Sequence, residues 1–149
     1  MEVYDIQKIQ LASSWDRSAL ESLLQSQGLR LDHDVETAFG VYETSGEEPK
    51  LVGCGCAAGA LLKCFALLPQ LRGQNLLGRL VSALTQDRFA AGYYDLMVIT
   101  RAHNETLFVN SGFWTVAKTE QLVLLENQPD GPARFTAPMV MDAGSAGAV

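Results

Sequence analysis

The sequence has 149 residues, of which 48% are hydrophobic and 19% are charged. This length is typical of one domain with a single core, and the composition is that of a folded globular protein rather than a disordered one. The net charge of −6 disfavours broad contact with nucleic acid or with an anionic membrane. The charge balance still permits one local basic site for a phosphorylated ligand.

Neither a membrane span nor a secretory signal is predicted. The longest apolar stretch, residues 54–68, is broken by Gly55, Gly59 and Lys63, whereas a spanning helix needs about 20 mostly apolar residues. The N-terminus lacks a basic region followed by an apolar run. We therefore expect a cytoplasmic protein.

The first predicted element is a helix over residues 14–27. Ser13 or Ser14 can cap its start, leucines recur within it at helical spacing, and Gly28 stands where a left-handed C-terminal cap belongs. A polar connection follows over residues 29–35, and we expect it to be a solvated loop.

This loop contains three consecutive potential metal ligands, Asp32, His33 and Asp34. Adjacent side chains are expected to diverge rather than to converge on one ion. We therefore predict no metal site here.

Three apolar runs come next, at residues 37–42, 50–57 and 61–68, separated by turn signals. Short loops can join only antiparallel neighbours, so these runs predict an antiparallel meander. Pro69 ends the third strand. Leucines at helical spacing after it predict an amphipathic helix that ends near Phe89.

The rest of the chain predicts a buried strand at 94–100, a short helix at 104–110 and a long final strand at 114–125. Strand–helix–strand units of this kind favour parallel or mixed pairing with right-handed crossovers, so the fold class is α/β (α+β). Beyond Asn127 the composition turns to Pro, Gly, Ala and small polar residues. This change predicts a domain over residues 1–127 and a linker or tail over 128–149.

Cys54, Cys56 and Cys64 cannot form a fully paired disulfide set, and they lack the C-x-x-C spacing of structural zinc sites. We interpret them as reduced core residues. A nucleophilic Cys64 is the less favoured alternative, because a buried cysteine on a strand is usually inert. Lys63 either holds a phosphate or acidic group or lies on a solvent-facing side of the sheet, and the second interpretation is favoured.

Residues 67–77 carry the strongest chemical signal. They end a buried strand, make a tight turn and begin a helix. A helix start offers unpaired backbone N–H groups and the positive end of the helix dipole, and Arg72 adds a cation there. This arrangement predicts a site for a phosphate or pyrophosphate.

This stretch resembles the acetyl-CoA-binding motif of GNAT acetyltransferases, R/Q-x-x-G-x-G/A, in which backbone amides hold the CoA pyrophosphate. The asparagine-led helix that ends before Gly112 and Phe113 resembles the family's second signature. The resemblance implies a mixed, mostly antiparallel central sheet with helices on both faces. It also implies a site for acetyl-CoA or a CoA-derived, dephospho-CoA-like group, formed by Leu67, Leu68, Arg72, Gly73, Gln74, Asn75, Leu76, Leu77, Asn104 and Phe108.

A narrower resemblance links residues 28–36, 53–64, 104–108 and 124–127 to the N-terminal domain of citrate lyase ligases. In that family a GNAT-like domain precedes a nucleotidyltransferase-type domain. The latter uses ATP and acetate to acetylate the thiol of the CoA-derived prosthetic group of citrate lyase. The resemblance implies that this chain is a fragment of a longer ligase, that residues 128–149 approach the second domain, and that ATP belongs to that domain only.

The sequence departs from the GNAT pattern at three positions. Asn75 and Leu77 replace the two later small residues of the motif. Asparagine tolerates a positive φ, whereas Leu77 either crowds the pyrophosphate position or turns inward to the core. Phe108 stands where the family has a tyrosine that protonates the leaving thiolate. His103 is a possible base, although a surface position is the favoured interpretation.

These features lead to three hypotheses. The favoured one is an accessory domain that recognises the acyl carrier subunit of citrate lyase, or its phosphopantetheine-like arm, without transferring acetyl groups itself. The alternative is a stand-alone N-acetyltransferase that uses acetyl-CoA and a small-molecule amine. The third is a non-catalytic binding module that retains only the fold. Nucleic acid and membranes are not expected partners.

Overall fold

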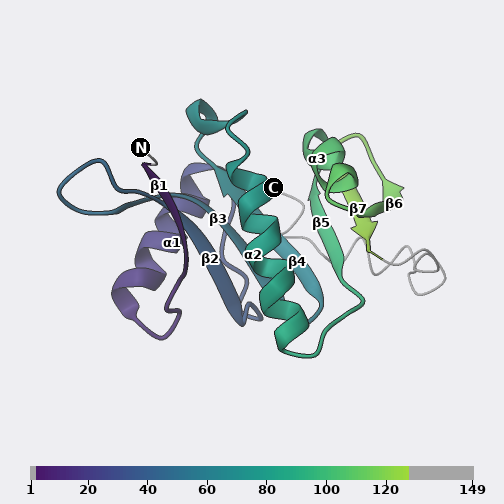
Figure 1. Ribbon diagram of the computed structural model, residues 1–149, viewed down its shortest axis with the longest axis horizontal. Coiled ribbons are helices and arrows are strands. Elements are labelled where there is room, and N and C mark those ends of the chain that lie inside the picture. Colours follow the sequence, from purple (N-terminus) through teal and green to yellow (C-terminus); the bar gives the residue numbers. More distant parts are fainter. Residues whose placement is uncertain (1–2, 128–149) are drawn as a thin grey trace.

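In residues 3–127, the part of the chain that the computed structural model describes, seven strands form one sheet and three α-helices pack against it (Figure 1). The predicted linker or tail at 128–149 lies outside the described residues. The elements and two short 3-10 turns are β1 (Tyr4–Lys8), α1 (Ser14–Ser26), β2 (Thr37–Glu43), β3 (Lys50–Ala58), β4 (Leu61–Leu67), η1 (Pro69–Leu71), α2 (Leu76–Ala90), β5 (Met97–Arg101), η2 (Ala102–Asn104), α3 (Glu105–Asn110), β6 (Trp114–Lys118) and β7 (Leu122–Glu126).

The strand order is β1-β2-β3-β4-β5-β7-β6, and every neighbouring pair is antiparallel except β4 and β5. The chain must cross over between two parallel strands, and α2 makes this connection. Helix α1 packs on one face of the sheet and α2 on the other (Figure 1). The predicted fold class, a mixed and mostly antiparallel sheet with helices on both faces, is confirmed.

Three elements differ from the prediction. Strand β1 was not predicted, because it is a half-exposed edge strand with no apolar run. Strand β5 begins at Met97 rather than at Tyr94. The long final strand is in fact a hairpin of β6 and β7, because the Thr119 hydroxyl accepts hydrogen bonds from the N–H groups of Gln121 and Leu122 and closes a turn.

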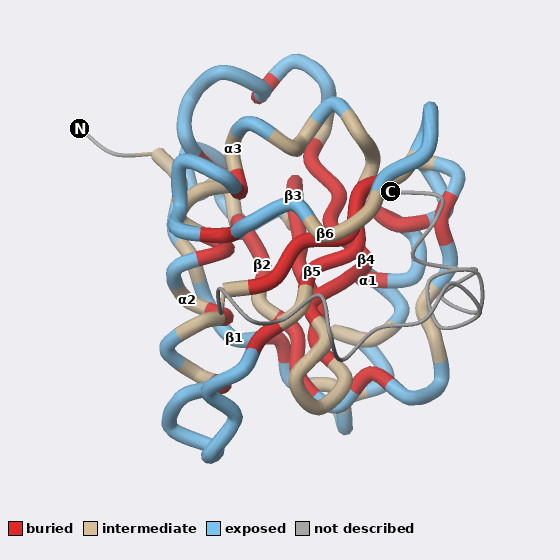
Figure 2. Tube along the Cα trace, turned by 90° about the vertical axis from the view of Figure 1, so that its right-hand side faces the viewer, coloured by how far each residue is buried: buried red, intermediate tan, exposed pale blue. Residues whose placement is uncertain are grey.

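The buried residues follow the strands of the sheet, whereas the outer surfaces of the helices are largely exposed (Figure 2). Helix α1 contributes three leucines to the core, and α2 contributes an apolar stripe that includes Leu80 and Leu84. The sequence periodicity had predicted both helices for this reason. No helix among residues 3–127 is long and apolar enough to cross a membrane.

A β-bulge divides β4 into two parts. Cys56 pairs with Lys63 and Cys54 pairs with Ala66, so Cys64 and Phe65 together lie opposite Gly55. Cys64 has a φ of 57°, in the left-handed region that side chains rarely adopt. Because of this extra residue, each side chain of β4 after Cys64 faces the side of the sheet opposite to the one it would face in a regular strand.

The two sides of the bulge therefore face different helices. A Cβ on Gly55 would meet Phe65 and Leu84 of α2, so Phe65 lies on the α2 face. Lys63 pairs with Cys56, the neighbour of Gly55. Adjacent residues of a strand face opposite sides of the sheet, so Lys63 lies on the α1 face. One short strand thus supplies an aromatic side chain to one face and a cation to the other.

Candidate functional site

A cleft opens where the two parallel strands separate. Strands β4 and β5 pair only at Leu61–Met97 and Leu62–Val98, close to where both strands begin. The pairing does not continue toward their carboxyl ends. The residues that line the cleft are Gln27, Leu29, Phe65, Ala66, Leu67, Arg72, Leu77, Arg101, His103 and Asn104.

The loop before α2 forms one rim of this cleft. Gly73 has a φ of 90° and Asn75 a φ of 59°, so both adopt the left-handed conformation that turns the chain into the helix. The expectation that Asn75 takes the place of a glycine with positive φ is confirmed. The first N–H groups of α2 have no acceptor within the helix and are available to an anion.

The side chain of Asn75 folds over Gly78, since a Cβ on Gly78 would collide with Asn75 Oδ1. Leu77 is partly buried, packs against the core and also lines the cleft. Leu77 therefore turns partly toward the core and still forms part of the cleft lining.

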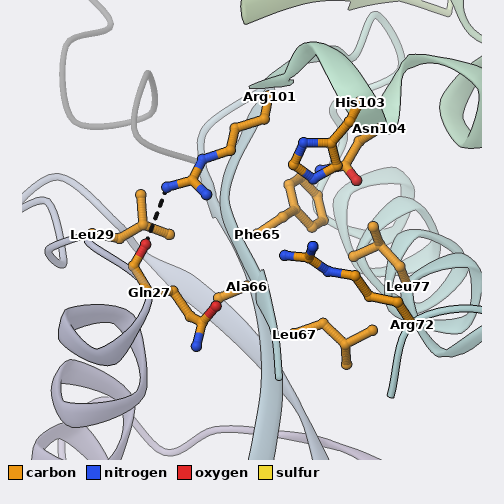
Figure 3. Close-up of a pocket in the computed structure, with 10 residues that line it drawn as sticks. All are labelled: Gln27, Leu29, Phe65, Ala66, Leu67, Arg72, Leu77, Arg101, His103 and Asn104. Carbon is orange, nitrogen blue, oxygen red and sulfur yellow. Dashed lines mark hydrogen bonds between the residues drawn. The ribbon is translucent and has the colours of Figure 1, made fainter. Parts of the chain in front are cut away.

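Three basic side chains from different elements converge on the cleft (Figure 3). Arg72 comes from the loop before α2, Arg101 from the end of β5, and His103 from the turn that follows. Burial lowers the pKa of His103, and the charges of Arg72 and Arg101 lower it further. The imidazole is therefore neutral at pH 7, exposed as predicted, and can accept a proton.

Removing one of these arginines is expected to raise the pKa of His103 toward its ordinary value of 6.5. An Arg101→Gln variant removes a nearby positive charge that opposes protonation of the imidazole. Titration of the His103 ring protons by NMR measures this change. Arg17→Gln is the control, since Arg17 is not among the charges that shift His103; an equal change in both variants would contradict the explanation.

The predicted site residues divide into residues that line the cleft, residues next to it, and Phe108, which lies beneath it. Four of them line the cleft, namely Leu67, Arg72, Leu77 and Asn104. Leu68, Gly73, Gln74, Asn75 and Leu76 lie in the adjoining loop and helix start. The Asn104 amide donates a hydrogen bond of 2.9 Å to the buried Thr100 hydroxyl, which holds this side chain at the cleft.

Phe108 lies beneath the cleft rather than in it. Its side chain is 0% exposed. Its ring makes edge contacts with Phe65 at 5.2 Å and with Phe113 at 5.9 Å between centroids. Phe65 in turn lines the cleft, so Phe108 supports the wall and has no ionisable group to offer a substrate.

The segment that follows α1 takes part in an ion-pair cluster that the sequence interpretation missed. Lys63 is buried, and its Nζ lies 2.9 Å from Asp32 Oδ2 and 2.9 Å from Asp34 Oδ1. The predictions of a solvent-facing Lys63 and of diverging carboxylates are both wrong. The N–H of Val35 donates to the Asp32 carbonyl oxygen, and the resulting turn brings both carboxylates to the same side.

Residues 27–36 include the predicted loop, which is only partly solvated: Leu29 and Val35 are buried, whereas His33 and Asp34 are exposed. Three cations attach this segment to the rest of the domain. Arg101 donates to the carbonyl oxygen of Gln27 at 3.1 Å, and Lys63 binds the two aspartates. Arg88 Nη1 lies 2.6 Å from Glu36 Oε1.

The three cysteines are free and buried, which confirms their interpretation as reduced core residues. Cys64 Sγ lies 4.0 Å from Asp32 Oδ2, next to the ion-pair cluster. The contact with the Cys56 thiol raises the pKa of Cys64 well above its usual range, and burial raises it further. Cys64 therefore stays protonated, as expected of a cysteine that is not a nucleophile. No group of three or more His, Cys, Asp or Glu side chains in residues 3–127 is placed to hold a metal ion.

Sequence interpretation did not identify Arg101, Phe65, Ala66, Gln27 or Leu29 as part of the site. One general signal was available for Arg101: it ends the strand that runs parallel to β4. The carboxyl ends of parallel strands meet at one edge of a sheet, and ligands bind there. Gln27 and Leu29 have no local signal, because only the packing of α1 brings them to the cleft.

Two similar sequences are citrate lyase ligases. The chain is 32% identical over 126 residues to [citrate [pro-3S]-lyase] ligase of Klebsiella pneumoniae, an overlap of 84% of this chain and 36% of that protein. It is 32% identical over 105 residues to the enzyme of the same name from Escherichia coli, an overlap of 70% of this chain and 30% of that protein. The chain thus spans about a third of the length of these relatives. No family model matches it.

Solved structures of acyltransferases share the fold. An acyl-CoA N-acyltransferase from Pseudomonas aeruginosa superposes with a TM-score of 0.64 at 14% identity, covering 84% of this chain and 99% of that one. The ribosomal-protein-S18-alanine N-acetyltransferase from Escherichia coli gives a TM-score of 0.61 at 15% identity, covering 83% and 92%. The chain therefore has a GNAT fold, and its sequence is similar to that of citrate lyase ligases.

Proposed function

We propose that this domain is an accessory part of a citrate lyase ligase and binds the CoA-derived group on the acyl carrier subunit of citrate lyase. The observation that carries this proposal is the cleft between the carboxyl ends of β4 and β5, with Arg72 and the start of α2 at its rim. The similarity to citrate lyase ligases supports the choice of parent enzyme. The cytoplasm, where such a ligase would meet its carrier subunit, remains the expected compartment.

The residues of the cleft fit a CoA-type group. Arg72 and the first N–H groups of α2 would hold its pyrophosphate, since both are donors to an anion. Phe65, Ala66 and Leu67 supply an apolar wall along which the pantetheine arm would lie. When bound, the group would present a thiol that accepts or carries an acetyl group.

An accessory role is favoured because the cleft lacks a suitable acid. Among the residues that line the cleft there is no tyrosine, aspartate or glutamate, and Phe108 is buried below them. The specific observation for the alternative, an N-acetyltransferase, is His103. A neutral imidazole can take a proton from an acceptor amine.

Calorimetric titration of the chain with dephospho-CoA and with acetyl-CoA tests the proposal. We expect both to bind, because they share the pyrophosphate and the pantetheine arm. Release of CoA thiol should stay at the uncatalysed rate when acetyl-CoA and a panel of amines are added. Amine-dependent release of CoA would contradict an accessory role and favour the acetyltransferase. Failure of both ligands to bind would contradict the proposed function.

The affinity for dephospho-CoA is expected to fall at least about tenfold in an Arg72→Gln variant, which loses a charge-assisted contact to the pyrophosphate. Arg79→Gln is the matched control, because Arg79 lies in the first turns of α2, close to this loop in the sequence, but does not line the cleft. The Asn75→Gly variant is expected to bind more tightly, since it removes the amide that covers Gly78 and the start of α2. Equal losses in the two arginine variants would contradict the assignment.

A further inference from the structure

The two arginines of the cleft approach it from opposite faces of the sheet. Arg72 belongs to the loop that leads into α2. Arg101 extends toward the end of α1, where its Nη2 donates to the carbonyl oxygen of Gln27 at 3.1 Å (Figure 3). Since α1 and α2 cover opposite faces (Figure 1), one phosphate at the start of α2 does not account for both cations.

The hydrogen bond that holds Arg101 in place does not neutralise its positive charge. Gln27 offers an uncharged carbonyl oxygen and engages one of the five N–H donors of the guanidinium. The side chain is partly buried and reaches the cleft. A tethered guanidinium of this kind loses little freedom when it binds an anion.

The electrostatic surroundings favour a negative ligand. None of the cleft-lining residues is an aspartate or glutamate. On the neighbouring α1–β2 segment, Asp32 and Asp34 both bind Lys63. Glu105, beyond Asn104, binds Lys118 and the Thr115 hydroxyl. Both arginines lie close enough to His103 for their charges to add to the effect of burial in lowering its pKa.

We infer that Arg101 forms a second anion-binding site on the α1 side of the cleft, which accepts a carboxylate or phosphate group of the molecule that meets the bound CoA-type group. The inference rests on the proposed function for the identity of the first ligand, but the Arg101 site itself does not depend on it. An ammonium group would meet two guanidinium charges without a counter-charge. The site therefore selects an anionic reaction partner and disfavours a protonated amine.

The test titrates inorganic phosphate, acetate and ethylammonium into an Arg72→Gln variant and an Arg72→Gln/Arg101→Gln variant, following the His103 ring by NMR. Removal of Arg72 weakens phosphate binding at the start of α2, so binding at the second site is followed with less interference. We expect phosphate or acetate to shift the His103 signals of the single variant. In the double variant their affinity should fall at least about tenfold, because a charge-assisted contact is lost.

The two anions distinguish the source of the ligand. Stronger binding of acetate assigns the site to a carboxylate, and stronger binding of phosphate assigns it to a phosphate. Equal anion binding by the single and double variants, or Arg101-dependent binding of ethylammonium, would overturn the inference. An Arg72→Gln/Arg101→Lys variant should bind the anion more tightly than the double glutamine variant, because lysine restores the positive charge. If Arg101 acted only by holding the fold in place, lysine would not restore the affinity.

The result is separable from the proposed function. If dephospho-CoA fails to bind the unmodified chain but the Arg101-dependent shift is seen, the proposed cofactor is wrong and the anion site stands. If dephospho-CoA binds and Arg101 makes no difference to either anion, the cofactor site stands and the inference is wrong. Thermal unfolding of each variant shows that the comparison is made between folded proteins.

Discussion

Replacing Lys63 by Met is expected to lower the free energy of unfolding by about 3 kcal/mol, because removal of one partner leaves a poorly hydrated carboxylate behind. The Lys63 side chain is 7% exposed and that of Asp32 is 14% exposed. Asp34 is 52% exposed and recovers most of its hydration in the variant. The main penalty therefore falls on Asp32. Urea-induced unfolding followed by circular dichroism measures the change.

Lys118→Met is the matched control. Lys118 also binds a carboxylate, Glu105, at 3.1 Å, but its side chain is 58% exposed. Because Lys118 is largely hydrated and Glu105 keeps its hydrogen bond to Thr115, the midpoint of unfolding should hardly move. If the two lysine variants unfold at the same urea concentration, the Lys63 cluster does not have the stabilising role that its burial indicates.

The effect of Lys63 on stability is also expected to depend on pH. The hydrogen bond from Lys63 lowers the pKa of Asp34 below its ordinary value of 3.8. The contribution of Asp34 is therefore complete well above pH 3.8 and is lost as the pH falls through its lower folded value. The stability difference between the unmodified chain and Lys63→Met should shrink on acidification over that range. A constant difference would indicate that the loss comes from packing alone.

Replacing Phe108 by Ala is expected to destabilise the domain by about 4 kcal/mol, the cost of an unfilled cavity in place of a buried aromatic ring. Phe108 is 0% exposed, and its ring contacts both Phe65 and Phe113. Loss of this support should also let Phe65 move away from the cleft, so binding of dephospho-CoA should weaken in the fraction that remains folded. Unfolding and calorimetric titration measure the two effects.

Phe89→Ala provides the comparison for Phe108→Ala. Phe89 makes one ring contact, with Tyr94, and is 40% exposed. Its removal is expected to cost less than about 1 kcal/mol, as for most surface substitutions. A similar loss in both phenylalanine variants would mean that the cluster around Phe108 is not closely packed.

Local patterns were sufficient to predict the strand, turn and helix start that form one rim of the cleft. The strand, the turn after Pro69 and the amphipathic helix all lie within a short stretch of sequence. The left-handed conformation of Asn75 followed from the steric preference of asparagine. The parallel pairing of β4 with β5 followed from the intervening helix.

Contacts between distant parts of the chain could not be predicted in this way. Lys63 binds aspartates that lie about thirty positions earlier, and no periodicity links them. Arg101 meets Gln27 only because α1 ends beside the end of β5. The bulge at Cys64 was equally hidden, since a left-handed cysteine carries no signal in an apolar run.

That bulge affects how this chain should be aligned with its relatives. Lys63 and Phe65 are two positions apart and would lie on the same face of a regular strand, yet they lie on opposite faces here. Deleting Cys64 would remove the bulge and leave Phe65 and Leu67 on the α2 side. A regular strand that kept Cys64 would instead turn the second half of β4 over and place the small Ala66 on that side. An alignment gap at this position therefore decides which side chains of a relative are equivalent to the cleft wall.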